Sequence, residues 1–523
     1  MLTASTKDIS SGEMVDFEDE PTLNKIPSEG YGWVEKFEGS SDYTRVGAKI
    51  CEQITLFLKL VICFSFKIMA SDASKSITLK ILVEKEKNRV VFAESNKDFV
   101  DVIFSFMTLP IGTIVELIHE HLLKGEIGCL NNLYESVENL DEEYLISEHK
   151  EILLHPRSAA EIYHRNLKIN LIESNSRSKY YVCFDADCSF LSYYQTSCCR
   201  CGNPLELEVN LSNPVSQDGG VFVKPTARFM ITDDFKVLPL STMAGLSLLS
   251  NFRTMDDSKL EERTVNIGKN ETSFTFRRGK YGPRSTCRSQ KVKDTKNVDT
   301  KTNLKLIINK SNNRALYAEV EENFVDVLCS FLAFPIGYVF KEFSSLSFKG
   351  CMGNLFKSIQ DTNINKFFKS EEMKDIVVNP KVAPGLACGN KLIGIEEAVN
   401  PSFSTLSSLF TTKCSDLNSN SLIGEVKIGG GFMKGPSMFM VTDNLSITPL
   451  SPISGISLIN KLKVPLSDVE ELEVTMGEEE ALRLLVASLV SRSALTDAFM
   501  IKETKQEPLG NIFISMLEER KKL

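Results

Sequence analysis

An internal duplication constrains the fold of this chain more than any other feature of its sequence. Residues 97–102 (KDFVDV) recur as 322–327 (ENFVDV), and residues 110–112 (PIG) recur as 335–337 (PIG), both at a displacement of 225 residues (322 − 97). Later matches share a displacement of 210: 229–233 with 439–443, 239–241 with 449–451, and 245–249 with 455–459. Repeated motifs in the same order indicate one structural unit built twice. We therefore expect two tandem copies of a single fold.

Composition narrows the class of protein. The 523 residues leave room for two to four domains, and 42% hydrophobic with 25% charged residues is close to the average for globular chains. The net charge is −9, which excludes a globally basic nucleic-acid-binding protein. We expect domains with ample hydrophobic core.

Periodicity gives the elements of each copy. Each copy begins with two segments that are rich in β-branched residues and flank a polar turn, which predicts a β-hairpin. These segments are 77–83 and 89–94 in the first copy and 304–308 and 314–319 in the second. A helix should follow, with Ser95 and Asp98 as a capping box. Its apolar stripe should be core: Phe99, Ile103 and Phe106, repeated as Phe324, Leu328 and Phe331. Strands and helices in this order predict an α+β fold.

The end of each copy contains adjacent polar residues between two predicted strands. Residues 229–240 and 439–450 each surround a turn, Asp233-Asp234 in the first copy and Asp443-Asn444 in the second. Paired carboxylates can serve acid–base or metal chemistry, but Asn replaces the second Asp in the copy, and both residues favour tight turns. We expect a structural turn. Residues 478–500 then predict an amphipathic helix whose polar face carries Arg483 and Ser488.

The pattern divides the chain into four parts. We expect a poorly ordered leader with a short apolar segment at 1–70, the first repeat at 71–262, a basic flexible linker at 263–300 and the second repeat at 301–523. The apolar run 54–68 contains Lys59 and Lys67 and is short for a membrane span, so a packed helix is favoured and no membrane is expected. Residues 277–301 carry nine Lys or Arg against two Asp, which suits a solvated tether or, alternatively, contacts with nucleic acid.

The cysteines supply the one motif with metal chemistry. There are 13, no secretory signal is visible, and five lie between residues 183 and 201, which indicates a reducing compartment and a metal site. The predicted ligands are two thiolate pairs between expected strands at 180–182 and 205–209: Cys183, Cys188, Cys198 and Cys201. Four thiolates suit a tetrahedral, structural zinc ion. Cys199 competes with Cys198 as a ligand, and a group of unliganded reduced cysteines is the alternative.

The second copy lacks this insertion. From Pro156 to Phe222 the first copy uses 66 residues (222 − 156), whereas from Pro380 to Phe432 the second uses 52 (432 − 380). The missing residues fall where the cysteine pairs would lie. Metal is therefore expected to stabilise a loop of the first copy and not the shared core.

Catalytic motifs are not recognisable in the sequence. All five histidines lie in the first copy: His119, His121, His149, His155 and His164. A spacing of two on a helix points His119 and His121 apart, so we expect both to be solvated. Gly430 and Gly435 have the spacing of a phosphate loop, but Pro436 stands where that motif has lysine.

Several motifs together resemble a known family, the plant proteins catalogued as domain of unknown function 674. They are Phe99-Val100-Asp101-Val102 with Pro110-Ile111-Gly112, Leu154-His155-Pro156-Arg157, Met230-Ile231-Thr232-Asp233-Asp234, Ala487-Ser488-Leu489 and Ala494-Leu495-Thr496-Asp497. The resemblance covers about residues 70–500 and implies a plant intracellular protein, cytoplasmic or nuclear, with cysteine pairs in its first copy. Members usually start with residues like Met69-Ala70-Ser71, which marks 1–68 as an extension. The family carries no assigned activity.

These observations combine into one hypothesis and two alternatives. We expect two tandem α+β repeats with a zinc-ribbon-like insertion in the first, acting as a non-enzymatic binding or scaffold protein for a protein partner. The first alternative is a nucleic-acid-associated protein that uses the ribbon and the basic linker. The second is an enzyme with an unrecognised site.

Overall fold

A computed structural model describes the greater part of the chain. It covers residues 76–86, 89–120, 127–145, 147–169, 179–182, 191–194, 207–210, 220–251, 259–267, 301–343, 351–384, 386, 392–398 and 431–500. The apolar run 54–68 and residues 277–300 of the basic stretch lie outside these ranges. Within them, no helix is both long enough and apolar enough to span a bilayer.

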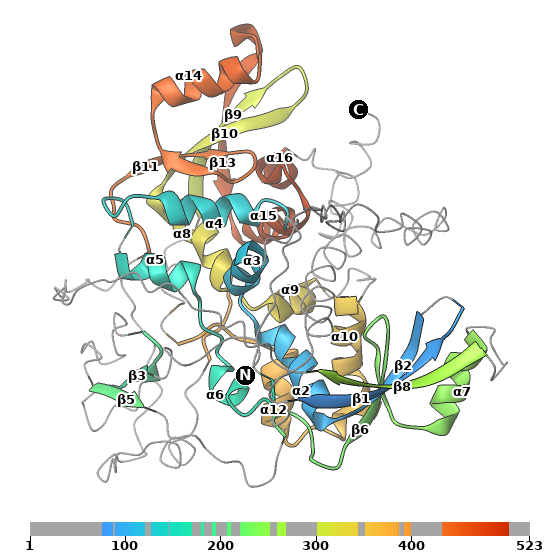
Figure 1. Cartoon of the computed structure of the whole chain (residues 1–523). Helices are drawn as coiled ribbons and strands as arrows, with labels where there is room; N and C mark the ends of the chain where they lie inside the picture. Colours follow the sequence, from blue (N-terminus) through green and yellow to red (C-terminus); the bar gives the residue numbers. More distant parts are fainter. Residues whose placement is uncertain are drawn as a thin grey trace, which may run out of the picture. The chain divides into compact units, whose positions relative to one another are not determined.

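Two five-stranded antiparallel sheets form the framework, one per copy (Figure 1). The first has the order β7-β6-β2-β1-β8, and the second has the equivalent order β12-β11-β10-β9-β13. The strands of the first sheet are β1 (Ile77–Glu84), β2 (Arg89–Asn96), β6 (Arg228–Thr232), β7 (Val237–Pro239) and β8 (Leu260–Ile267). Those of the second are β9 (Thr302–Asn309), β10 (Arg314–Glu321), β11 (Met438–Thr442), β12 (Ile447–Pro449) and β13 (Val469–Met476). The predicted hairpins and strand pairs are confirmed.

A buried helix follows the first hairpin of each copy, as predicted. It is α2 (Lys97–Ser105) in the first copy and α8 (Glu322–Ser330) in the second, extended by the short helices η3 (Phe106–Thr108) and η5 (Phe331–Ala333). The predicted stripe is core, with all six side chains buried. The predicted cap was wrong by one residue: Asn96, not Ser95, accepts from the Asp98 N–H, because α2 begins at Lys97, and the Ser95 hydroxyl donates to the Asn96 carbonyl instead.

The remaining helices differ between the copies mainly after the sheet. The first copy has α3 (Ile111–Glu120), α4 (Leu130–Asn139), α5 (Ser147–Leu154), α6 (Glu161–His164) and α7 (Thr242–Asn251). The second has α9 (Ile336–Glu342), α10 (Cys351–Gln360), α11 (Thr362–Asn365), α12 (Glu371–Val378), α14 (Pro452–Lys461), η7 (Leu466–Asp468), α15 (Glu478–Val490) and α16 (Ala494–Phe499).

The last predicted helix, 478–500, is interrupted. It ends at Val490 and resumes at Ala494, so α15 and α16 are separate helices. The predicted polar face was also wrong at Ser488, which is fully buried. Its hydroxyl donates to the Leu485 carbonyl, and its own carbonyl accepts from the Cys129 N–H at 2.7 Å. Contact with the first copy therefore covers this face.

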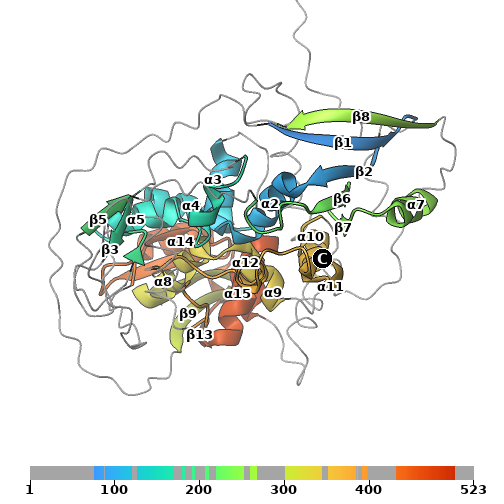
Figure 2. The same cartoon turned by 90° about the horizontal axis from the view of Figure 1, so that it is seen from below.

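Each copy also packs helices against the edge of the other copy's sheet. Helix α4 of the first copy contacts β12 and α8 of the second, and α10 of the second contacts β7 of the first (Figures 1 and 2). The contacts are reciprocal. The Ser136 hydroxyl oxygen accepts from the Ile447 N–H at 2.9 Å, and that of Ser358 accepts from the Val237 N–H at 3.0 Å. The two copies thus exchange equivalent helices.

The chain crosses between the copies at the repeated Pro-Ile-Gly motif. The Ile111 N–H donates to the Phe334 carbonyl at 2.8 Å, and the Ile336 N–H donates to the Leu109 carbonyl at 2.9 Å. Glycine follows each isoleucine because the other copy is very close. A Cβ at Gly112 would lie 3.0 Å from the Leu332 carbonyl oxygen.

Extended segments complete the exchange. The Lys224 N–H donates to the Phe367 carbonyl at 2.8 Å, and the equivalent Lys434 N–H donates to the Tyr144 carbonyl at 2.7 Å. One continuous hydrophobic core accordingly contains buried residues of both copies, among them Phe104 and Phe331. A small second core lies between α14 and the second sheet. The duplicated sequence therefore folds as an intertwined pair.

Candidate functional site: a buried arginine cluster beside the cysteine segments

A third, three-stranded sheet interrupts the first copy near the cysteines. Its order is β4-β3-β5, with β3 at Lys179–Val182, β4 at Leu191–Ser192 and β5 at Leu207–Asn210. The strands predicted around 180–182 and 205–209 are confirmed. Residue Val182 lies opposite both Leu191 and Leu207, so the chain leaves and re-enters this sheet at one end.

In the sequence, the predicted zinc ligands fall between β3 and β4 and between β4 and β5. Cys183, Cys188, Cys198 and Cys201, with the competing Cys199, are outside the described residues. Among the residues that are described, no group of three or more His, Cys, Asp or Glu side chains could hold a metal ion. The zinc site therefore stays a prediction.

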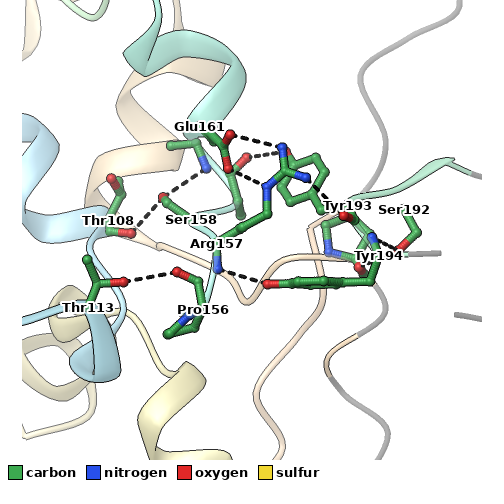
Figure 3. Close-up of polar contacts among 12 residues, drawn as sticks. Thr108, Thr113, Pro156, Arg157, Ser158, Glu161, Ser192, Tyr193 and Tyr194 are labelled. Carbon is green, nitrogen blue, oxygen red and sulfur yellow. Dashed lines mark hydrogen bonds and ion pairs between the residues drawn. The ribbon is translucent and has the colours of Figure 1, made fainter. Parts of the chain in front are cut away.

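Arg157 lies buried where this sheet meets the helices (Figure 3). Its guanidinium donates twice to the Glu161 carboxylate, from Nε to Oε2 at 2.6 Å and from an Nη atom to Oε1 at 2.9 Å. Burial by itself would lower the pKa of Arg157, but the Glu161 carboxylate more than offsets this and raises it above its ordinary value. Arg157 is thus held charged in the interior.

Aromatic rings from the small sheet enclose this ion pair. The guanidinium carbon of Arg157 lies 4.8 Å from the ring centroid of Tyr180 and 4.7 Å from that of Tyr193. The two rings pack edge to face at 5.2 Å. Arg157 also donates to the Tyr193 carbonyl at 2.9 Å. Such cation–π contacts strengthen when water is excluded, as it is from these buried side chains.

Hydrogen bonds also join residues 157–159 to the small sheet on one side and to η3 on the other. The Arg157 N–H donates to the Tyr194 hydroxyl at 2.8 Å, and the Tyr193 hydroxyl donates to the Ala159 carbonyl at 2.9 Å. On the other side, Ser158 donates to the Thr108 carbonyl at 2.7 Å (Figure 3). The small sheet is thereby joined to η3, which precedes the Pro110-Ile111-Gly112 motif. It reaches the second copy as well, through the Ser192 hydroxyl and the Pro384 carbonyl at 3.2 Å.

His164 lies beside this cluster and is bonded within the fold. His164 is buried, and its Nε2 lies 2.8 Å from the Thr108 hydroxyl, which itself donates to the Ser105 carbonyl. The Thr108 hydroxyl oxygen therefore accepts a hydrogen bond from the Nε2–H of His164. Burial lowers the pKa of His164 to about 4, so the ring is neutral at neutral pH. The Thr108–His164 contact is a structural hydrogen bond.

Two further histidines have partners on neighbouring helices. His155 Nδ1 lies 2.7 Å from the buried Glu116 carboxylate and is half-buried. His119, predicted to be solvated, is half-buried instead, with Nε2 3.0 Å from the Asn131 amide and its ring edge to face with Tyr134. The His119 prediction was wrong because α4 packs over that side of α3. His121 lies outside the described residues.

The Asp of the repeated Phe-Val-Asp-Val motif holds a distant loop in each copy. Asp101 accepts from the N–H groups of Val221, Phe222 and Val223 at 2.6, 2.8 and 3.0 Å. Asp326 accepts from the equivalent N–H groups of the second copy at 2.8 and 2.9 Å. Burial raises the pKa of Asp101 to about 6 and that of Asp326 to about 7, although the amide donors lower both.

The Asp233-Asp234 and Asp443-Asn444 pairs form turns, as predicted. The Asp234 and Asn444 side chains both accept from the threonine hydroxyl two residues earlier, a role that Asp and Asn fill equally.

Asp443 has a second contact, with Thr496. Its carboxylate accepts from the Thr496 N–H at 2.8 Å and from the Thr496 hydroxyl at 2.9 Å. Burial raises the pKa of Asp443 to about 6. The contact between Asp443 and Thr496 joins helix α16 to the second sheet.

Two features of the structure were missed from sequence, the burial of Arg157 and the exchange of helices between the copies. Arg157 belongs to a motif that was noticed, but its burial depends on the tyrosines of a distant sheet. The exchange of helices has a clearer signal, because a short motif of α4 recurs in α10 with a displacement of 222 residues. The motif is Gly128-Cys129, Asn132-Leu133 and Ser136 in the first copy and Gly350-Cys351, Asn354-Leu355 and Ser358 in the second. The repeated Asn and Ser are the residues that contact the opposite copy.

Comparison with known proteins places the chain by sequence. A family model described as "Protein of unknown function (DUF674)" matches it twice, over residues 73–274 and 275–479. No curated protein and no solved structure gives a match. Because the two matched segments span well over half of the sequence, the chain is a member of the DUF674 family that carries two copies of the family's domain.

Proposed function

We propose that this chain is a non-enzymatic binding or scaffold protein, in which a structural zinc ion organises the cysteine segments of the first copy. The Arg157 cluster carries the proposal. A buried ion pair and three tyrosines fix the small sheet to the intertwined body, and the cysteine segments connect the strands of this sheet in the sequence. A rigidly mounted loop is suited to presenting a surface to a partner.

The chemistry of the neighbouring polar groups supports the same role. The carboxylates of Asp101, Asp326 and Asp443 accept from backbone N–H groups, and that of Glu161 holds Arg157. His164 is neutral and bonded to Thr108. Catalytic acids and bases must reach a substrate, whereas these groups spend their hydrogen bonds on the fold.

Metal analysis tests the zinc part. The purified full chain is expected to contain one zinc ion per molecule by mass spectrometry of the metal, because four thiolates saturate a tetrahedral ion. Cys198→Ser and Cys201→Ser should lose it, and Cys199→Ser decides which of the adjacent cysteines binds. Cys287→Ser, far from the pairs in sequence, is the matched control. Wild-type protein without stoichiometric zinc would contradict the site.

A separate experiment tests the binding role. The tagged full chain should copurify with a specific protein partner, and this capture should weaken in the Cys201→Ser variant while the Cys287→Ser variant behaves as wild type. Isolation of the protein alone, combined with turnover in a broad substrate screen, would contradict a non-enzymatic role.

A further inference from the structure

Large apolar side chains are exposed at equivalent places in the two copies. In the described part of the chain they are Leu240, Met243, Leu246, Met438, Ile453, Ile456, Leu462 and Leu466. Met243 and Leu246 lie on α7, and Ile453 and Ile456 lie at the matching positions of α14, 210 residues later (453 − 243). Exposed apolar residues that gather on one element mark interaction surfaces, whereas single ones do not.

Among the described residues, the second copy has the larger of the two surfaces. Ile453, Ile456, Leu462 and Leu466, here called the α14 ridge, are 80%, 56%, 49% and 75% exposed. They follow one another along α14 and the turn that leads into η7. No such continuation is described after α7. The α14 ridge is therefore the stronger candidate for a docking surface.

The fold itself does not require this ridge. Helix α14 is held by its opposite side, where Ile459 is buried against Ile307, Tyr317 and Met440 of the second sheet. The helix lies so close that a Cβ at Gly455 would come within 2.8 Å of the Tyr317 hydroxyl. The exposed side chains point away from the residues that stabilise the helix, so they are available to a partner.

Charges of both signs border the ridge. Lys461 and Lys463 are exposed at its centre, and no acidic residue occurs from Asn444 to Ser467. Beside it, Glu471 and Glu473 lie opposite Ile307 and Lys305 in the sheet, where the Lys305 ammonium pairs with Glu471 at 2.9 Å and the three charges sum to −1. Directly opposed residues share a face, so both glutamates are on the face that α14 covers. A complementary partner needs an apolar stripe, an acidic patch and a basic patch.

This surface itself has all three features. We infer that the α14 ridge is the contact of a homodimer, in which twofold pairing places Lys461 and Lys463 of each chain against Glu471 and Glu473 of the other. A twofold interface uses the same patch on both subunits, and a patch with separate positive and negative regions is self-complementary in that arrangement. The inference goes beyond the proposed binding role, because self-association can fail while zinc and partner binding hold.

Two other occupants fit the charges less well. Juxtamembrane surfaces that bind anionic lipid carry clusters of about four to eight basic residues, and interfacial helices usually add Trp or Phe. The ridge has two lysines, only aliphatic side chains and two glutamates beside it. A uniformly acidic protein segment would be repelled by the same glutamates.

The oligomeric state of the full chain tests the inference. Light scattering coupled to size exclusion, repeated at increasing concentration, should show a mass that rises from one chain to two. The double variant Ile453→Asp/Ile456→Asp should raise the dimer Kd by at least about tenfold, since charges replace the centre of the interface. Met243→Asp/Leu246→Asp is the matched control on α7 and should dimerise as wild type does.

Charge reversal gives a second and gentler readout. Lys461→Glu/Lys463→Glu should weaken dimerisation, and adding Glu471→Lys/Glu473→Lys to the same chain should restore it, because every cross-contact again joins opposite charges. Circular dichroism confirms that each variant is folded. A wild type that stays monomeric, a dimer insensitive to the ridge, or ridge-dependent sedimentation of monomer with phosphatidylserine vesicles would each overturn the inference.

Discussion

The two copies treat one equivalent position in opposite ways. In the first copy Arg157 follows Pro156, is buried, and forms a bidentate ion pair with Glu161 inside a ring of tyrosines. In the second copy Lys381 follows Pro380, and its ammonium pairs with Glu396 at 2.7 Å while both side chains remain partly exposed. The same backbone motif thus carries a buried ion pair in one copy and a solvated one in the other.

The difference shows why the small sheet of the first copy is paired with arginine at this position. When a sheet covers the motif, the cation loses its water and needs fixed partners in return. A guanidinium can meet a carboxylate with two parallel N–H groups and stack on rings, whereas an ammonium is a compact, strongly hydrated charge. We infer that arginine accompanies the small sheet, and that lysine suffices at the partly exposed position of the second copy.

The largest expected effect is at Arg157. Arg157→Ala should lower the free energy of unfolding by about 3–5 kcal/mol, because it leaves the Glu161 carboxylate buried without its counter-charge. Lys381→Ala, the matched change in the second copy, should cost less than about 1 kcal/mol. Urea unfolding followed by circular dichroism measures both. Equal losses at the two positions would show that burial does not distinguish the copies.

The second effect depends on pH and contrasts Asp326 with Asp101. The pKa of Asp326 is raised from 3.8 to about 7 in the folded chain, so the folded state binds this proton more tightly than the unfolded state. Its contribution is complete below about pH 4 and is lost as the pH rises to about 7, with a slope of at most about 1.4 kcal/mol per pH unit. For Asp101 the window ends near pH 6.

Asparagine at these positions sharpens the contrast. Both N–H groups at Asp326 donate to Oδ1, which an Asn side chain can supply, so Asp326→Asn should flatten the pH dependence and be no less stable than wild type at pH 8. At Asp101, Val221 donates to the other oxygen, which Asn replaces with an NH₂ group. Asp101→Asn should therefore cost about 1–3 kcal/mol at neutral pH. Unfolding curves between pH 4 and 8 that do not differ between the two variants would contradict this.

The smallest expected effect compares the glycines at the crossing. A Cβ at Gly337 would lie 2.6 Å from the Met107 carbonyl oxygen, against 3.0 Å for the closest contact at Gly112. Gly337→Ala should thus cost about 1–3 kcal/mol through overpacking, and Gly112→Ala less. Gly245→Ala on α7, where the nearest atom is 3.8 Å away, is the control and should be neutral or slightly stabilising in thermal unfolding. A Gly337 variant as stable as this control would argue against tight crossing.

The hairpins and the buried helices could be predicted because the pattern of apolar residues that forms each of them lies within one short segment. Alternation at 77–83 and the helical stripe of Phe99, Ile103 and Phe106 identify the hairpin and the buried helix, and both are found. The errors occurred where distant contacts decide. Ser488 looks solvent-facing on a helical wheel but is covered by the first copy, and the Ser-Arg-Ser step at 491–493 ends a helix that periodicity alone would continue.

The candidate site was predictable only in part for the same reason. The cysteine spacing draws attention to residues 183–201, and the flanking strands are where the pattern placed them. No local signal shows that Arg157 is buried, because its environment is made by Tyr180 and Tyr193, residues that lie on a separate sheet. Burial of a charge is a property of the assembled fold.

Duplication, the hairpins of each copy and membership of the DUF674 family follow from the sequence itself, since repeated motifs and hydrophobic period are encoded residue by residue. The tertiary structure alone decided which helix covers which sheet. A repeat can pack on its own sheet or on that of its copy with the same local contacts, because the two surfaces are nearly identical. The crossing at Pro110 and Pro335 selects the exchanged arrangement.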